Sequence, residues 1–248
     1  MVDYGTMIQR LACSSHAVAL TGAGISVESG IPDFRSTGGF WSRYDPMVYG
    51  HIEAFRMNPA EVWKMLLEMD ALLSCAVPNA AHYALARLEE RGILREVITQ
   101  NVDSLHQRAG SRKVIEFHGH NRSLRCEACG RSYQREGVDL KRVPPVCACG
   151  GPLRPEFVFF GEQIPQDAYR QAMDAARQCD FLMVVGTSAS VAPASHIPGL
   201  AKRRGAFILE INPKPSELRE ETVDFRISQS AGQALPQIVK ALEAGDDQ

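Results

Sequence analysis

The sequence lacks the features that would direct the chain into or across a membrane. Its first ten residues contain no basic segment followed by an apolar run, so no secretory signal is predicted. No stretch approaches the roughly 18 to 20 consecutive apolar residues that a membrane span needs, so no membrane partner is expected. These absences predict a cytoplasmic protein, in which cysteines stay reduced and clustered cysteines indicate a metal before a disulfide.

A surplus of positive charge is also lacking. The 248 residues include 27 Lys and Arg against 29 Asp and Glu, for a formal net charge of −2. A protein whose main partner is nucleic acid needs basic residues to neutralise phosphates, so nucleic acid is an unexpected partner. With 45% hydrophobic and 23% charged residues, the chain can form one large core, or a main domain with an inserted module.

Short apolar runs alternate with helical patterns along most of the chain. Strands are predicted at 17–21, 96–99, 181–185, 206–211 and 224–227. Helices are predicted at 8–14, 59–74, 80–91, 165–178 and 192–204. Continuous apolar runs fit strands covered on both faces, and this alternation favours an α/β fold with a parallel, Rossmann-like sheet.

Four of the predicted strands end in small or polar residues. The segments that follow them are Gly22-Ala-Gly24, Gln100-Asn-Val-Asp103, Gly186-Thr-Ser188 and Asn212. Ligands of an open parallel sheet bind outside the carboxyl ends of its strands, so these segments predict a binding rim.

The first of these segments is a glycine-rich loop that departs from the strict dinucleotide fingerprint. The third glycine of that fingerprint is replaced by Val27, and no acidic residue closes a second strand about 20 residues further on. Glycines let backbone N–H groups approach an anion closely, which favours phosphate binding. A simple connection between a strand and a helix is the alternative.

Residues 119–157 have no clear long helix, and they contain four of the seven cysteines. Cys126 and Cys129 form one close pair, Cys147 and Cys149 form another, and seventeen residues lie between the pairs. This spacing is typical of a tetrahedral zinc site, and four thiolates leave no position for water, so the zinc is predicted to be structural. Free or disulfide-linked cysteines are one alternative, and a nucleic-acid-binding zinc ribbon is another.

Taken together, the motifs resemble those of the sirtuins over nearly the whole chain. Besides the paired cysteines, the matching segments are Gly22-Ala-Gly-Ile-Ser-Val-Glu-Ser-Gly-Ile-Pro-Asp-Phe-Arg35, Thr99-Gln-Asn-Val-Asp-Ser-Leu-His106, Phe117-His-Gly119, Val158-Phe-Phe-Gly-Glu162, Gly186-Thr-Ser188 and Ile211-Asn212.

The resemblance implies a protein-lysine deacylase that consumes NAD as a co-substrate. In that reaction the acyl carbonyl oxygen attacks the ribose carbon that bears nicotinamide, and water then releases free lysine and O-acyl-ADP-ribose. Acyl-lysine proteins or peptides are the implied partners. A mono-ADP-ribosyltransferase and a non-catalytic NAD- or zinc-binding module remain as alternatives.

The resemblance also implies a role for each site residue. His118 corresponds to the general base, and imidazole suits that task because it titrates near neutrality. Asn101 and Asp103 correspond to the pair that positions the ribose and the nicotinamide carboxamide, and Phe34 to the residue that shields the ribose. The other implied dinucleotide contacts are Gly22, Ala23, Gly24, Ser26, Val27, Arg35, Gln100, Val102, Gly186, Thr187, Ser188, Asn212 and Ala231.

Five residues are implied to bind the acylated peptide. Val158 and Phe160 correspond to the walls of a tunnel for the acyl-lysine, and Gly161, Glu162 and Val191 to residues flanking a peptide bound as a β-strand. Core packing is the alternative role for the apolar members.

One departure from the family concerns the acyl group. Sirtuins that prefer acidic acyl groups carry a Tyr-x-x-Arg pair at positions that correspond to Leu66 and Met69 here. An apolar pair cannot bind a buried carboxylate, so acetyl or longer apolar acyl groups are the predicted substrates.

The resemblance also predicts how the chain is divided into three structural parts. Residues 1–34, 79–118 and 158–248 form the expected NAD-binding domain, residues 35–78 a helical and loop insertion, and residues 119–157 a zinc-binding module.

Overall fold

The computed structural model describes residues 2–34 and 38–246, and its largest feature is a six-stranded sheet. Its strand order is β3-β2-β1-β7-β8-β9, and every neighbouring pair is parallel. The strands are β1 (Ala17–Thr21), β2 (Leu94–Thr99), β3 (Val114–Glu116), β7 (Phe181–Val185), β8 (Phe207–Ile211) and β9 (Phe225–Ile227). The predicted α/β class with a parallel sheet is therefore confirmed.

Helices cover both faces of this sheet, because successive strand side chains point to opposite faces. On β1, Ala17 and Ala19 pack into the apolar cluster under α1, α5 and α9, whereas Val18 and Leu20 pack into the cluster under α7 and α8. These helices are α1 (Tyr4–Ala12), α5 (Ala80–Glu90), α7 (Gln166–Gln178), α8 (His196–Arg203) and α9 (Ala231–Asp246), and the short α6 (Leu105–Arg108) follows β2. None of the described helices is long and apolar enough to cross a membrane.

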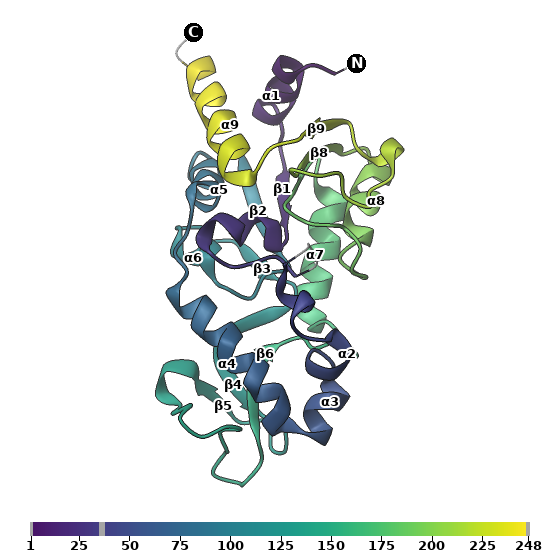
Figure 1. The fold of residues 1–248 in the computed structure, drawn as a ribbon. Helices are drawn as coiled ribbons and strands as arrows, with labels where there is room; N and C mark the ends of the chain where they lie inside the picture. The colour runs from purple at the N-terminus through teal and green to yellow at the C-terminus, as the bar shows by residue number, and fades with distance from the viewer. Residues whose placement is uncertain (1, 35–37, 247–248) are drawn as a thin grey trace.

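The smaller part of the molecule contains a three-stranded antiparallel sheet in the order β5-β4-β6. Its strands are β4 (Gly119–Cys126), β5 (Ser132–Gln134) and β6 (Leu153–Phe157), and α2 (Pro46–Tyr49), α3 (Ile52–Met57) and α4 (Pro59–Cys75) pack beside them. The indole N–H of Trp63 in α4 donates to the carbonyl of Leu153 at 2.8 Å, which fixes the helix on the sheet. Figure 1 shows this part at the end of the molecule farthest from both termini.

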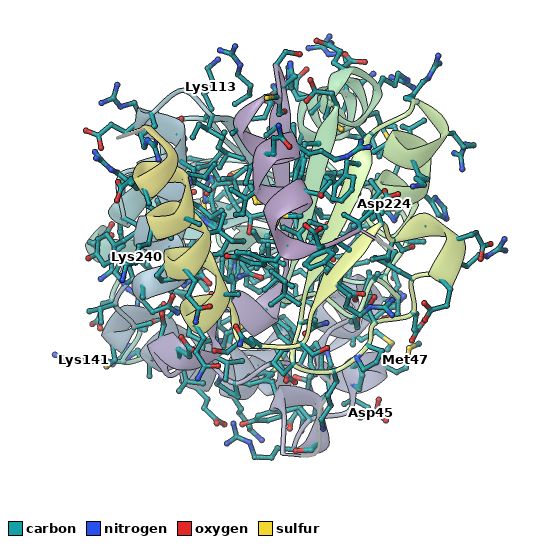
Figure 2. All side chains as sticks on the ribbon, turned by 90° about the horizontal axis from the view of Figure 1, so that it is seen from above. Asp45, Met47, Lys113, Lys141, Asp224 and Lys240 are labelled. Atoms are coloured by element: carbon teal, nitrogen blue, oxygen red, sulfur yellow. The ribbon has the colours of Figure 1, made fainter. Side chains whose placement is uncertain are left out.

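Four 3₁₀-helical segments complete the secondary structure of the described residues. They are η1 (Ala23–Ser29), η2 (Phe40–Ser42), η3 (Arg135–Gly137) and η4 (Glu220–Thr222). Figure 2 shows charged side chains such as Lys113 and Lys141 at the periphery of a packed interior, as expected for a sheet covered on both faces.

Two predicted helix starts are wrong. The first helix begins at Tyr4, before the predicted 8–14, because the Asp3 carboxylate accepts the Thr6 N–H and caps it. The helix predicted at 192–204 begins only at His196, since a residue that precedes proline is disfavoured in helical conformation and Pro193 follows Ala192. The strands β3 to β6 and the helices α2, α3, α6 and α9 were not predicted.

Glycines allow β1 and β7 to meet at the point where the strand order reverses. A Cβ on Gly186, where φ is +59°, would lie 2.4 Å from the backbone nitrogen of Ile25. A Cβ on Gly24 would lie 2.7 Å from the Cα of Gly186. The two loops therefore touch backbone to backbone, and the crevice of a doubly wound sheet opens beside this contact.

Gly186→Ala should destabilise the protein much more than Gly205→Ala. Both glycines have positive φ, but only Gly186 has no space for a Cβ. Gly205→Ala should lower the free energy of unfolding by about 1 kcal/mol through backbone strain alone, and Gly186→Ala by about 3 kcal/mol or more through strain and overlap. Urea unfolding of both variants measures the difference, and equal losses would contradict the assigned contact.

Candidate active site

A cavity of about 760 Å³ lies at the carboxyl ends of the parallel strands and extends toward the small sheet. Every predicted dinucleotide residue that the structure describes lines it, except Ala231. These residues are Gly22, Ala23, Gly24, Ser26, Val27, Phe34, Gln100, Asn101, Val102, Asp103, His118, Gly186, Thr187, Ser188 and Asn212. The five predicted peptide residues, Val158, Phe160, Gly161, Glu162 and Val191, line the same cavity. Segments far apart in the sequence therefore meet at one site.

Ser26, Asn101 and Asp103 form a connected polar group in this cavity. The Ser26 hydroxyl donates to the Asp103 carboxylate at 2.7 Å, and the Asn101 side-chain amide donates to Ser26 Oγ at 3.1 Å and to the Gly22 carbonyl at 3.2 Å. The Leu105 N–H donates to the second Asp103 oxygen at 2.9 Å. Burial raises the pKa of Asp103 against these hydrogen bonds. The group is therefore held in place by partners on β1, β2 and their loops.

A second polar chain joins the ends of three strands. The Gln100 amide donates to Thr187 Oγ1 at 3.0 Å, and the Asn212 amide donates to the Thr187 carbonyl at 3.0 Å. These contacts connect the residues after β2, β7 and β8. The predicted binding rim is thus a hydrogen-bonded arc.

His118 follows β3 and has a fixed tautomer. Its Nδ1 lies 3.0 Å from the carbonyl oxygen of Gln100, and because a carbonyl can only accept, Nδ1 carries the proton. The other ring nitrogen, Nε2, is then the basic one. Burial lowers the pKa of His118, and the bond to Gln100 partly opposes this effect. The ring is therefore neutral at physiological pH and able to accept a proton.

Two other histidines, His82 and His106, lie below the cavity floor in the core. Burial lowers the pKa of His82 to about 4 and that of His106 to about 3. His106 Nε2 contacts Thr21 Oγ1 at 3.0 Å, and the two rings are 5.0 Å apart between centroids. Neither ring lines the cavity. His106 contacts Thr21 and His82 lies 3.5 Å from Ser26 Oγ, so both rings pack beneath residues at and just after the end of β1.

The end of the cavity near the small sheet is apolar. Its walls include Met65, Met69, Leu72, Leu73, Phe157 and Phe159. Of the two residues predicted to face the acyl group, Met69 lines the cavity, but Leu66 does not. Leu66 is buried in the cluster with Trp63, and Met65 takes the wall position. Because Met65 is also apolar, the cavity wall beside Met69 is apolar, as predicted.

Other residues were missed by sequence reasoning or lie elsewhere. Glu28, Asp33 and Lys214 also line the cavity. The first two lie within the matched segment 22–35 and could have been found there, whereas Lys214 follows Asn212 outside any motif. Ser230 lines it in place of the predicted Ala231, which is buried as the first residue of α9. The predicted Arg35 lies outside the described residues.

The four predicted zinc ligands meet in the small part of the molecule. Their sulfur atoms all lie within 4.8 Å of one another, with 3.5 Å between Cys126 and Cys149 and 3.6 Å between Cys129 and Cys147. A tetrahedral zinc ion with Zn–S bonds of about 2.3 Å holds its sulfurs roughly 3.8 Å apart, so the cluster fits a structural zinc. The Tyr133 hydroxyl contacts Cys147 Sγ at 3.0 Å, which completes the surroundings of that thiolate.

Fold and site together define a dinucleotide-binding α/β protein with a structural zinc module. A sequence model of the Sir2 family matches residues 22–193. The chain belongs to the Sir2 family, as the resemblance of its motifs predicted.

Several relatives match over almost their whole length. NAD-dependent protein deacylase 2 of Pyrobaculum aerophilum is 48% identical over 234 residues, covering 94% of this chain and 93% of that protein. NAD-dependent protein deacylase 2 of Archaeoglobus fulgidus is 44% identical over 238 residues, covering 94% of this chain and 93% of that protein. The crystal structure of a Sir2 homologue in complex with NAD has a TM-score of 0.92 at 41% identity, covering 99% of this chain and 95% of that one.

The zinc site can be tested by metal analysis. Cys147→Ser should lose the bound zinc and the small sheet, because the module has little core of its own and structural zinc contributes directly to folding. Cys75→Ser, at an exposed cysteine outside the cluster, is the matched control. Zinc content by atomic absorption and thermal unfolding measure both effects, and a Cys147→Ser protein that keeps its zinc would contradict the ligand set.

Proposed function

We propose that this chain is an NAD-dependent protein-lysine deacylase that forms nicotinamide, deacylated lysine and O-acyl-ADP-ribose. One observation carries the proposal: a neutral histidine with a fixed tautomer, His118, opens into a cavity that is polar at the strand ends and apolar toward the small sheet. A dinucleotide fits the polar end and an acyl-lysine stem the apolar end. The deacylase names of the relatives support the same activity.

The polar group would orient the reacting end of NAD. Asn101 and Asp103 combine an amide with a carboxylate, so they can accept from ribose hydroxyls and from a carboxamide. Ser26 fixes the Asp103 carboxylate at 2.7 Å before substrate arrives. Such preorganisation avoids reorientation of the site during the reaction.

His118 would act as the general base. Nε2 is unprotonated because Nδ1 donates to Gln100, so it can take the proton from a ribose hydroxyl when the acyl oxygen has reacted. The same bond keeps the imidazole ring from rotating.

Aromatic side chains would exclude competing water. Phe34 packs against Trp41 with 5.5 Å between ring centroids, and Trp41 packs against Phe160 at 6.1 Å. All three rings line the cavity. Water would then enter only after nicotinamide has left.

The peptide would bind as a strand beside residues 160–162 and Val191. The backbone of Phe160 is already fixed at the cavity mouth, because it pairs in parallel with His51 through hydrogen bonds to Gly50 and Ile52. Main-chain hydrogen bonds give affinity with little dependence on sequence. That nucleic acid is not a partner, and that the protein is cytoplasmic, stay predictions from the sequence.

His118→Ala should lower kcat for deacylation by about 10² to 10⁴, the usual contribution of a general base. His196→Ala, at an exposed histidine of α8, should leave the rate unchanged. Protonation removes the basic form, so activity falls as pH decreases through the pKa of His118. Because burial lowers that pKa from 6.5, the acid limb of kcat/KM for NAD should have its midpoint below pH 6.5.

Nicotinamide and deacetylated peptide, measured together with an acetyl-lysine peptide, decide this prediction. Equal amounts of both products that depend on NAD and on His118 support a deacylase. Nicotinamide without deacetylation would instead indicate ADP-ribosyl transfer or NAD hydrolysis. Release of neither product would indicate a binding module. An acid limb with its midpoint above pH 6.5 would contradict the assignment of His118 as the base.

Succinyl-lysine should be a poor substrate. Burying its carboxylate against Met65 and Met69 without a partner should lower kcat/KM at least about tenfold relative to acetyl-lysine, equivalent to about 1.4 kcal/mol. Met69→Arg supplies a cation at the cavity wall and should narrow the difference in kcat/KM between acetyl-lysine and succinyl-lysine. Met57→Arg, on the exposed face of α3, should leave that difference unchanged. Faster desuccinylation than deacetylation by the unmodified chain would refute the prediction.

A further inference from the structure

Four charged side chains of alternating sign connect the zinc module with the segment at the cavity mouth. They are Arg56 on α3, Glu127 between two of the zinc cysteines, Arg154 on β6 and Glu162 at the end of residues 157–162. The inner three, Glu127, Arg154 and Glu162, are called the Arg154 bridge below.

Arg154 is the centre of the bridge and is almost fully buried, with 3% of its side chain exposed. Its Nε donates to Glu127 at 3.0 Å, and its two terminal nitrogens donate to Glu162 at 3.0 and 2.6 Å. It also donates to the carbonyl of Phe157 at 3.1 Å and lies over the Phe159 ring. A buried guanidinium needs both carboxylates, because loss of one partner leaves charge unpaired in a low dielectric.

The Glu162 end of the bridge fixes the backbone of the segment that lines the cavity. Besides Arg154, the Glu162 carboxylate accepts the Phe159 N–H at 2.9 Å. The Val158 N–H donates to the His118 carbonyl at 2.9 Å, so the segment begins beside the proposed base. The carboxylate is thus directed into the protein rather than offered to a ligand.

The Glu127 end depends on the zinc module. Glu127 directly follows Cys126 and precedes Cys129, and its N–H donates to the Pro152 carbonyl at 3.0 Å. The turn that carries two metal ligands therefore also sets the position of this carboxylate. Exposed Arg56 holds the outer oxygen of Glu127 at 2.8 Å.

We propose that the Arg154 bridge transmits the metal-bound state of the cysteine turn to residues 157–162, and that Arg154 is a positioning residue for the acylated peptide. This inference rests on the proposed deacylase function. Dinucleotide binding stays independent of the bridge, because none of its residues contacts the polar group at the strand ends. Loss of the metal would then weaken peptide binding while NAD still binds.

Glu127→Gln and Arg154→Lys test the bridge. The glutamine keeps the shape but removes the charge, and lysine cannot hold both carboxylates in the geometry of a guanidinium. Each should raise the KM for an acetyl-lysine peptide about tenfold, a typical coupling between sites, with the KM for NAD unchanged. Zinc content should stay at the level of the unmodified chain.

Two controls separate positioning from general damage. Arg226→Lys disturbs a comparable pair with buried Glu210 in the large sheet and should leave the peptide KM unchanged. Arg56→Gln removes the exposed outer partner of Glu127 and should have a much smaller effect than Arg154→Lys. Urea midpoints of all four variants show whether each is folded under assay conditions.

Binding of a fluorescent acetyl-lysine peptide, measured by anisotropy, tests the bridge without turnover. Chelation of zinc should weaken peptide binding by the unmodified chain at least as much as Glu127→Gln does, while NAD binding is retained. An unchanged peptide Kd and KM in both bridge variants, or an equal rise in the KM for NAD, would overturn the inference. An unmodified chain that binds the peptide but releases no deacetylated product would contradict the proposed function. A peptide Kd that still rises in both bridge variants would then support the bridge alone.

Discussion

The site depends on the contact between the Gly22–Gly24 loop and the backbone of Gly186. No side chain fits between these segments, so the ends of β1 and β7 stay as close as two backbones allow. The close approach brings Ser26 within hydrogen-bond distance of Asn101 and Asp103, which follow the neighbouring strand. Any residue that separated β1 from β7 would therefore also separate Ser26 from Asn101 and Asp103, the polar group proposed to orient the dinucleotide.

Polar residues at the strand ends keep this geometry without a ligand. Gln100 connects two parts of the site, because its side chain donates to Thr187 while its carbonyl accepts from His118. Buried polar groups are costly unless they are hydrogen-bonded, so each of these bonds restricts the positions of the others. His118, Gln100, Thr187 and Asn212 thus form one connected chain of hydrogen bonds, set by the register of the parallel strands.

The large sheet was predictable because its strands are continuous apolar runs, and 181–185 was predicted with its observed bounds. The small sheet was missed because β4 is mostly polar, and zinc and side-chain bonds replace the apolar core that would give periodicity. The dinucleotide residues could be located from motifs that follow strands. The wall residue Met65 could not, because which face of α4 meets the cavity is set by Trp63 packing against a strand 90 residues away. The predicted domain boundaries and residue roles stay predictions.

A module with so small a core gains stability from few interactions, and each therefore restricts the structure strongly. Zinc fixes the two cysteine turns, and buried Arg154 joins one of these turns to the segment at the cavity mouth. The guanidinium is stable only when Glu127 and Glu162 both occupy their observed positions. The cysteine turn and residues 157–162 therefore keep their observed positions only together. Under the proposed bridge, a metal that takes no part in the chemistry would still control how tightly the site binds an acylated peptide.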